Sequence, residues 1–256
     1  MPRKARKTSE TGIYHVMVRG INRQEIFHDD EDRQRYLRTL KRITEESKSL
    51  VLGYCLMSNH VHLLIKEDKS ISHVMKRVGA SYAYWYNWKY ERTGHVFQDR
   101  FKSECVEDDT YLMIVIRYIH QNPIKARIVQ KPDEYLWSSC RAYYGAKENP
   151  ANLTQTQFIL SIFANQKEKA IERMRDFQAK NDDASCLEDI EKKRLNQEAA
   201  RQVITEKLNG RPIAVLQQLP AEERNEILKQ IKEIEGLSLR QIASITGLTV
   251  NAVHKA

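Results

Sequence analysis

The sequence contains two histidines, His60 and His62, separated by one valine within an apolar run that is typical of a β-strand. The run from Gly53 to Ile65 consists mainly of apolar and β-favouring residues. Because side chains alternate between the two faces of a strand, both imidazoles project from one face and Val61 from the other. Two imidazoles on a rigid strand form half of a metal site, but so short a pattern also arises by chance. The interpretation therefore depends on ligands supplied by the rest of the chain.

A second segment, from Asp108 to Asn122, can supply them. Acidic residues at its start, apolar residues at helical spacing and a following proline predict a helix that ends before Pro123. Tyr118 and Asn122 are four residues apart on this helix and share a face, whereas His120 points away from them and is expected at the helix surface. The Asn122 amide oxygen is a candidate third ligand for Mg²⁺ or Mn²⁺. Tyr118 is a candidate nucleophile toward phosphorus beside such an ion.

The order of predicted elements indicates an α+β fold. Strands are predicted at 13–19, 50–57, 60–66 and 97–106, and helices at 30–47, 72–92 and 108–122. This order favours a ferredoxin-like or RRM-like antiparallel sheet with helices on one side. After residue 146 aromatic residues become rare and Lys, Glu and Gln dominate helical patterns, so the C-terminal region is predicted to be all-α.

These segments resemble the single-tyrosine HUH transposases of the IS200/IS605 type, and among them the REP-associated tyrosine transposases. The resembling stretches are 14–24, 57–65, 94–102, 117–126 and 137–139, in the expected order. The resemblance implies that His60 and His62 hold the metal and that Tyr118 is the nucleophile. It also implies that Asn122 completes the metal site. IS200/IS605 enzymes commonly have glutamine at that last position, so Gln121 stays a lesser candidate.

The resemblance also implies an activity. It predicts a metal-dependent endonuclease and strand transferase that acts on single-stranded DNA beside palindromic hairpins and forms a 5′-phosphotyrosine intermediate. The main alternative is a non-catalytic nucleic-acid-binding regulator built on the same fold. A zinc enzyme that uses the histidine pair for hydrolysis is a third reading.

The positive charge of the chain is concentrated in its first part. The net charge is +8, and residues 1–145 hold 25 Lys and Arg against 18 Asp and Glu. A basic surface of this kind suits a phosphate backbone, although a solvated surface explains the charge equally well. The candidate DNA contacts follow the first predicted strand or alternate along one face of the fourth: Arg19, Asn22, Arg23, Gln98, Arg100 and Lys102.

The predicted helix 72–92 is rich in aromatic residues. Tyr82, Trp85 and Tyr86 have the helical spacing of a buried stripe. Tyr84 and Trp88 are candidates to stack on unpaired bases.

Three segments are expected along the chain: a nuclease domain at 1–145, a helical connector at 146–225 and a helix-turn-helix at 226–256. In the last, Ser238 and Thr249 are predicted to cap two short helices on either side of Gly247. The pattern resembles a helix-turn-helix whose second helix enters the major groove of duplex DNA, with Thr249 and Asn251 as candidate contacts. The alternative is a helical hairpin used for packing or dimerisation, so an oligomer is compatible with the sequence.

The cysteines bear on the cellular compartment. Cys55, Cys105, Cys140 and Cys186 show no C-x-x-C spacing, which favours reduced structural thiols. No secretory signal and no apolar run of about 18 residues is found. We therefore expect a bacterial cytoplasmic protein associated with the nucleoid and no membrane partner.

Overall fold

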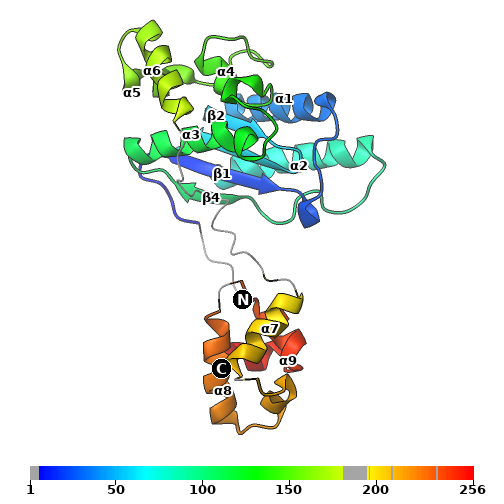
Figure 1. Ribbon diagram of the computed structural model, residues 1–256. Helices are drawn as coiled ribbons and strands as arrows, with labels where there is room; N and C mark the ends of the chain where they lie inside the picture. The colour runs from blue at the N-terminus through cyan, green and yellow to red at the C-terminus, as the bar shows by residue number, and fades with distance from the viewer. Residues whose placement is uncertain (1–5, 181–194, 196, 209, 235) are drawn as a thin grey trace. The chain divides into compact units, whose positions relative to one another are not determined.

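The computed structural model describes residues 6–180, 195, 197–208, 210–234 and 236–256 (Figure 1). These residues form two compact units, one within residues 1–188 and one within residues 189–256. None of the described helices combines the length and the apolar character needed to cross a membrane. The expected boundaries after residues 145 and 225 differ from this division, and the assignment of the chemistry to residues 1–145 stays a prediction.

The first unit is built on a four-stranded antiparallel sheet with the strand order β2-β3-β1-β4. Its strands are β1 (Ile13–Arg19), β2 (Leu50–Leu56), β3 (His60–Lys66) and β4 (Lys102–Cys105). The central strands β1 and β3 pair over their full length, from Ile13 opposite Lys66 to Arg19 opposite His60. The predicted α+β fold with an antiparallel sheet is confirmed, and the histidine strand is central.

Helices cover both faces of the sheet, so the prediction that they lie on one side is wrong (Figure 1). Helices α1 (Asp30–Ser47) and α2 (Ile71–Lys89) share an apolar cluster with Leu63, whereas α3 (Asp109–Lys125) shares one with Leu64. The interior of β3 is buried at every position. A strand that is buried on both faces must be covered on both.

Three further helices follow α3 in the first unit, and two of them lie beyond residue 145. They are α4 (Cys140–Tyr143), α5 (Thr156–Phe163) and α6 (Lys167–Ala179), and short 3₁₀ turns form η1 (Ile21–Arg23) and η2 (Pro132–Glu134). Leu160 of α5 and Met174 of α6 share an apolar cluster with Leu112 and Ile119 of α3. Helix α3 therefore packs against both the sheet and these helices.

Two predicted element boundaries are wrong. Helix α3 continues through Pro123 to Lys125, because the turn after the proline keeps its hydrogen bonds, from Ala126 N to Asn122 O and from Ile128 N to the Pro123 carbonyl. The fourth strand is limited to β4 instead of residues 97–106. Lys102 pairs with Met17, and Phe97 forms a bridge with Gly20. The chain from Phe97 to Lys102 is longer than the chain from Met17 to Gly20, so its extra residues bulge out of the ladder.

The second unit is all-α, as predicted. It contains α7 (Gln197–Lys207), the 3₁₀ turn η3 (Ile213–Gln217), α8 (Ala221–Lys232), α9 (Leu239–Thr246) and α10 (Val250–Lys255). Ser238 and Thr249 cap α9 and α10 by accepting backbone hydrogen bonds, as the sequence indicated. Gly247 ends α9 in the left-handed conformation with φ 70°. The helix pair is present as predicted, and its contact with DNA stays a prediction.

Candidate active site

The two histidines of β3 lie on the face of the sheet that α3 covers. His62 is fully buried and His60 is partly buried. Their ring centroids are 5.1 Å apart and their planes are nearly perpendicular, at 89°. The alternation of side chains along the strand therefore brings both imidazoles to one place, as predicted.

Tyr118 reaches these histidines from α3. Its ring contacts His62 edge-on, with the centroids 5.5 Å apart, and it contacts His15 of β1 at 5.9 Å. The Tyr118 side chain is only 5% exposed. The ammonium group of Lys125 lies 4.6 Å from the centre of the Tyr118 ring. Lys125 was not among the residues predicted for the site. Residues far apart in the sequence thus form one cluster of two imidazoles, a phenol and a cation.

Asn122 lies one helical turn after Tyr118 and is buried. Its amide Nδ2 donates a hydrogen bond to the Tyr118 carbonyl at 2.9 Å, which fixes the amide and leaves Oδ1 as the atom that can act as a ligand. Gln121, the lesser candidate, donates instead to the Gln178 and Lys180 carbonyls, both at 2.9 Å. Gln121 therefore anchors the end of α6, and Asn122 is the better placed of the two amides.

Behind the histidine pair lies a pair of residues to which the sequence analysis gave no role. His15 is fully buried on β1, with Nδ1 2.7 Å from the Glu104 carboxylate and Nε2 3.0 Å from Nδ1 of His62. Glu104 lies directly opposite His15 in the pairing of β4 with β1. The sequence shows a histidine in the first strand, but only the register between strands reveals its partners.

Asn59 plays a part beyond turning the hairpin between β2 and β3. Its Oδ1 lies 2.6 Å from Nδ1 of His60, and its Nδ2 donates to the Arg23 carbonyl at 3.1 Å. The loop after β1 and the histidine strand are thereby joined at the edge of the site.

His120 is buried, so its expected place at the helix surface is wrong. Its Nε2 lies 2.8 Å from the Ser139 hydroxyl and its Nδ1 2.9 Å from Nε2 of Gln178. Burial lowers the pKa of His120 to about 3, so the ring is neutral and structural. The face of α3 opposite Tyr118 is covered by the segment after residue 137 and by α6, which periodicity within α3 alone does not reveal.

The side chains of this site can be compared with those that bind metal ions in proteins. No group of three His, Cys, Asp or Glu side chains in the described part of the chain is placed to hold one. A divalent ion held by His60 and His62 would therefore need a third donor of another type, and the Asn122 amide oxygen is the candidate that the sequence predicted. Two imidazoles and one amide oxygen fit an ion that completes its coordination with water and phosphate oxygens.

The predicted DNA contacts lie in several places. Asn22 and Arg23 are exposed in η1 with φ of 51° and 60°, and Arg19 ends β1 opposite His60. Lys102 is exposed at the start of β4. Gln98 and Arg100 are also exposed but lie outside the strand, so the expectation that they share a strand face with Lys102 is wrong. In the second unit, Thr249 and Asn251 are exposed at the start of α10.

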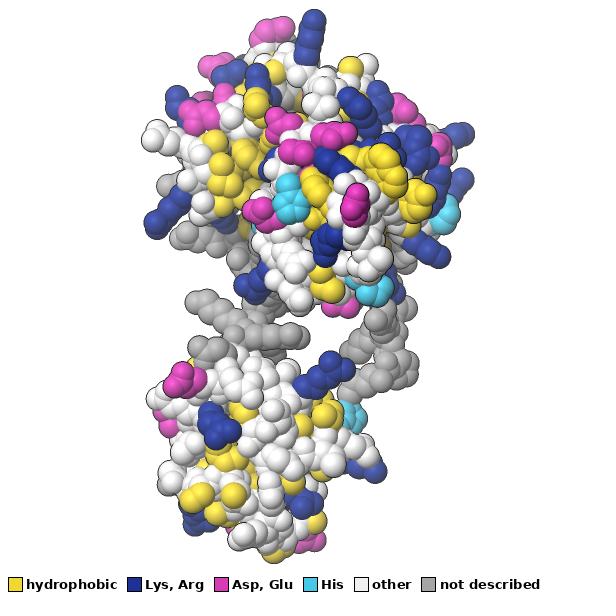
Figure 2. All heavy atoms as spheres, turned by 90° about the vertical axis from the view of Figure 1, so that its right-hand side faces the viewer, with side chains coloured by type: hydrophobic (Ala, Val, Ile, Leu, Met, Phe, Trp, Pro, Cys, Tyr) yellow, Lys and Arg dark blue, Asp and Glu magenta, His cyan; other side chains and the backbone are white. Residues whose placement is uncertain are grey.

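The aromatic residues of α2 divide as predicted. Tyr82 and Tyr86 are buried and Trp85 is partly buried against the same core. Tyr84 and Trp88 are 79% and 73% exposed. On the face of the first unit in Figure 2, Lys and Arg side chains are interspersed with acidic and apolar ones, so the basic surplus is not a uniform patch there.

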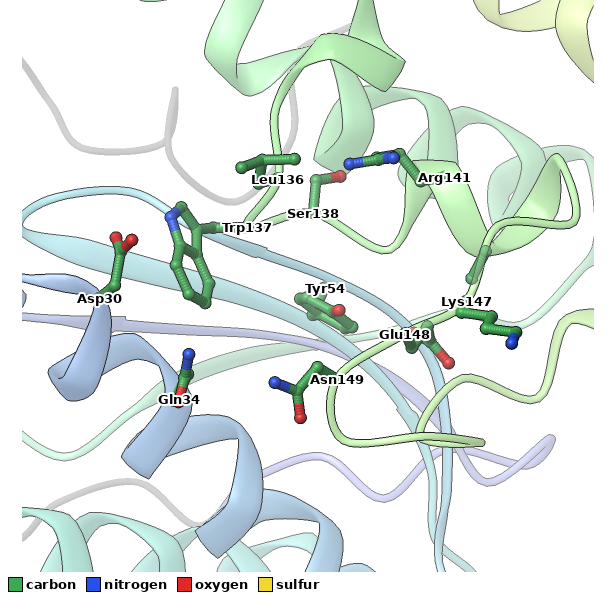
Figure 3. A pocket seen from close by; sticks show the side chains of 11 residues that line it. Asp30, Gln34, Tyr54, Leu136, Trp137, Ser138, Arg141, Lys147, Glu148 and Asn149 are labelled. Carbon is green, nitrogen blue, oxygen red and sulfur yellow. The ribbon is translucent and has the colours of Figure 1, made fainter.

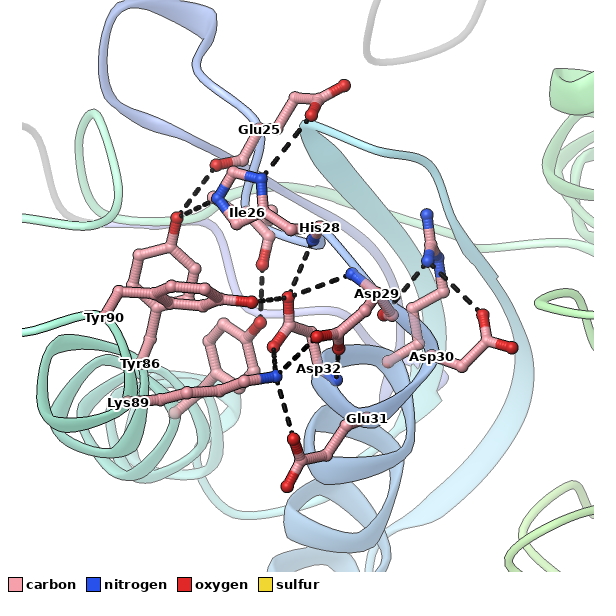
Figure 4. A network of polar contacts seen from close by, with 12 residues as sticks. Glu25, Ile26, His28, Asp29, Asp30, Glu31, Asp32, Tyr86, Lys89 and Tyr90 are labelled. Atoms are coloured by element: carbon pink, nitrogen blue, oxygen red, sulfur yellow. Dashed lines mark hydrogen bonds and ion pairs between the residues drawn. The ribbon is translucent and has the colours of Figure 1, made fainter.

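Two other features lie away from this cluster. The Lys89 ammonium bridges α2 to the start of α1 through Asp29, Glu31 and Asp32, at 2.8, 2.9 and 2.8 Å (Figure 4). A cavity of about 290 Å³ lies at the β2 edge of the sheet, between Trp137, Gln34 and the segment after α4 (Figure 3). Neither feature involves α3 or the histidine–tyrosine cluster.

The sequence of residues 8–122 matches the family model described as "Transposase IS200 like". This part of the chain is therefore similar to transposases of the IS200 type. The matching segment spans a little under half of the chain, includes both histidines and Tyr118, and ends at Asn122. The predicted family is thereby confirmed.

Two solved structures are similar to the chain. One is a REP-associated tyrosine transposase bound to a REP hairpin, with 15% identity over 57% of this chain and 86% of that chain and a TM-score of 0.49. The other is a protein of Deinococcus radiodurans R1 assigned as a transposase, with 18% identity over 44% of this chain and 92% of that chain and a TM-score of 0.34. No curated protein matches the chain.

Proposed function

We propose that the chain is a metal-dependent single-strand DNA endonuclease and strand transferase with Tyr118 as its nucleophile. The observation that carries this proposal is the edge-on contact of the Tyr118 ring with His62, 5.5 Å between centroids, beside a second histidine on the same strand. A phenol next to two imidazoles on a transposase-family domain suits the attack of a side-chain oxygen on a phosphodiester.

The reaction follows from the position of the phenol. The Tyr118 oxygen forms a bond to phosphorus, and the bond from phosphorus to the 3′ oxygen breaks. The phenol gives up its proton and the departing 3′ oxygen takes one up, so the products are a 5′-phosphotyrosine and a free 3′-hydroxyl. Because the phosphodiester energy is retained, the 3′-hydroxyl of a second strand can reverse the step and join the strands.

Each side chain of the site has a role in this scheme. His60, His62 and Asn122 would hold Mg²⁺ or Mn²⁺, which when bound supplies Lewis-acid polarisation of the scissile phosphate. Lys125, 4.6 Å from the centre of the Tyr118 ring, would stabilise negative charge that develops between phenol and phosphate. The contacts of Tyr118 with two rings hold the nucleophile in one orientation, which lowers the entropic cost of attack.

The DNA partner is single-stranded DNA beside a hairpin, which rests on the resemblance in the sequence. Arg19, Asn22, Arg23 and Lys102 lie at the ends of β1 and β4, where they would contact phosphates or bases. Gln98 and Arg100 would do so from the bulge before β4. The second unit would contact duplex DNA through Thr249 and Asn251 at the start of α10.

The test is a covalent adduct. The full chain is incubated with Mg²⁺ and labelled single strands that carry hairpins, and the products are separated on a denaturing gel. We expect a band of protein joined to the labelled 5′ end, lost on addition of a chelator. Binding to the hairpin without adduct formation under any divalent ion would favour the non-catalytic regulator instead.

A further inference from the structure

We propose that Asn59 and the pair of His15 and Glu104 are positioning residues that fix the ring tautomers of His60 and His62. In this arrangement both metal-facing nitrogens are Nε2 and both carry a lone pair. The inference rests on the proposed function for its purpose, but the tautomers themselves belong to the metal-free protein and can be measured there.

The tautomer of His62 follows from a chain of two hydrogen bonds. A carboxylate only accepts, so the Nδ1–H of His15 donates to Glu104 across 2.7 Å. In the arrangement that we propose, the His15 ring carries this single N–H, and its Nε2 accepts. The donor 3.0 Å away is Nδ1–H of His62, which places the lone pair of His62 on Nε2.

The tautomer of His60 follows from the orientation of one amide. The Arg23 carbonyl can only accept, so the Asn59 atom 3.1 Å from it is the NH₂ group. This contact therefore decides which end of the Asn59 amide is nitrogen and which is oxygen. The other amide atom is therefore the carbonyl oxygen, 2.6 Å from Nδ1 of His60. That nitrogen must donate, which again places the lone pair on Nε2.

Two independent partners thus impose the same tautomer on two rings that stand 5.1 Å apart on one strand. Partners of this kind orient imidazole ligands and raise their affinity for a metal, and their loss typically costs about 10- to 100-fold in metal affinity. Without them each ring can move its proton to Nε2, where it blocks the nitrogen that would bind the ion.

The experiment uses the full-length chain labelled with ¹⁵N in its histidine rings, free of metal and DNA, at neutral pH. Long-range ¹⁵N–¹H correlation spectra identify which ring nitrogen carries the proton. We expect Nδ1–H for both His60 and His62. Asn59→Ala should change the tautomer of His60 alone, and His15→Phe that of His62 alone, whereas His73→Phe on the exposed side of α2 should change neither.

Affinity for Mn²⁺, measured by calorimetry on the same variants, gives the second readout. We expect a loss of about 10- to 100-fold for Asn59→Ala and for His15→Phe. Asn59→Asp should recover most of the affinity, because a carboxylate can still accept from Nδ1–H of His60. Asn59 lies in a hairpin loop, so this series tests the idea even if His15→Phe fails to fold.

Two results would overturn the inference. One is an Nε2–H tautomer at either His60 or His62 in the unchanged chain, which would follow if His15 carried two protons and donated to His62. The other is an unchanged tautomer and Mn²⁺ affinity in both variants. Neither measurement involves Tyr118 or DNA. If the proposed function is wrong but this inference is right, the chain will show the expected tautomers and form no covalent adduct with DNA.

Discussion

Replacement of His120 with glutamine should flatten the dependence of stability on pH in the first unit. His120 is fully buried between the Ser139 hydroxyl and the Gln178 amide, and its pKa is lowered to about 3 from the ordinary 6.5. Between these two values the unfolded chain binds one proton more than the folded chain, so stability rises with pH across that window and falls on acidification. Glutamine does not titrate, and the variant lacks this contribution.

The size of the effect follows from the pKa difference. One pH unit corresponds to about 1.4 kcal/mol, so protonation of the unfolded His120 costs the folded state about 1.4 kcal/mol at about pH 5.5 and about 2.7 kcal/mol at about pH 4.5. Other groups titrate as well, but they do so in both proteins. The difference between the two pH profiles therefore isolates His120, whatever stability the substitution costs at neutral pH.

The assay is urea unfolding followed by tryptophan fluorescence at several pH values. All three tryptophans, Trp85, Trp88 and Trp137, belong to the first unit, so the signal reports that unit alone. His73→Gln, at an exposed position, is the matched control and should follow the unchanged chain. Equal losses of unfolding free energy in the unchanged chain and the His120 variant between about pH 7.5 and about pH 4.5 would refute the reasoning.

Three further outcomes concern the chemistry and the second unit. Tyr118→Phe should abolish the covalent adduct on a denaturing gel, because the nucleophilic oxygen is lost, and should change hairpin affinity in a gel shift by less than about twofold. Tyr84→Phe is the control. An adduct formed by the Tyr118 variant would show that another residue is the nucleophile. The double substitution of His60 and His62 by alanine should remove Mn²⁺ binding in calorimetry and keep the far-UV circular dichroism spectrum, and undiminished Mn²⁺ binding would exclude these ligands. Asn251→Ala should weaken binding to a preferred duplex by about 1–3 kcal/mol in fluorescence anisotropy and leave other duplexes unaffected, as expected of a base contact, and a uniform loss would indicate a phosphate contact instead.

The parts of the fold that sequence predicted well are those set by local interactions. The caps at Ser238 and Thr249 depend on one side chain and a nearby backbone N–H, and both are present. The projection of His60 and His62 to one side follows from the pleat of a single strand. The meeting of Tyr118 with His62 was also expected, because a resemblance across several segments carries information on tertiary contacts that one segment lacks.

The parts that sequence missed depend on contacts between elements. His15 meets Glu104 and His62 only because of the register in which three strands pair, and no periodicity encodes that register. The burial of His120 requires α6, which arrives from more than forty residues away. The bulge before β4 arises because the two paired segments differ in length, and this difference cannot be seen in either segment alone.

The packing of α3 has a consequence for what can move during a reaction. Four of its apolar side chains, Leu112, Val115, Ile116 and Ile119, are at most 1% exposed. A movement of this helix away from the sheet would expose these side chains, at a free-energy cost of about 1.5–3 kcal/mol each, or roughly 6–12 kcal/mol in all. This cost is comparable to the whole stability of a domain. In the proposed reaction, a strand end attached to Tyr118 would therefore stay beside this sheet, and the DNA would have to move to bring the second 3′ end into line.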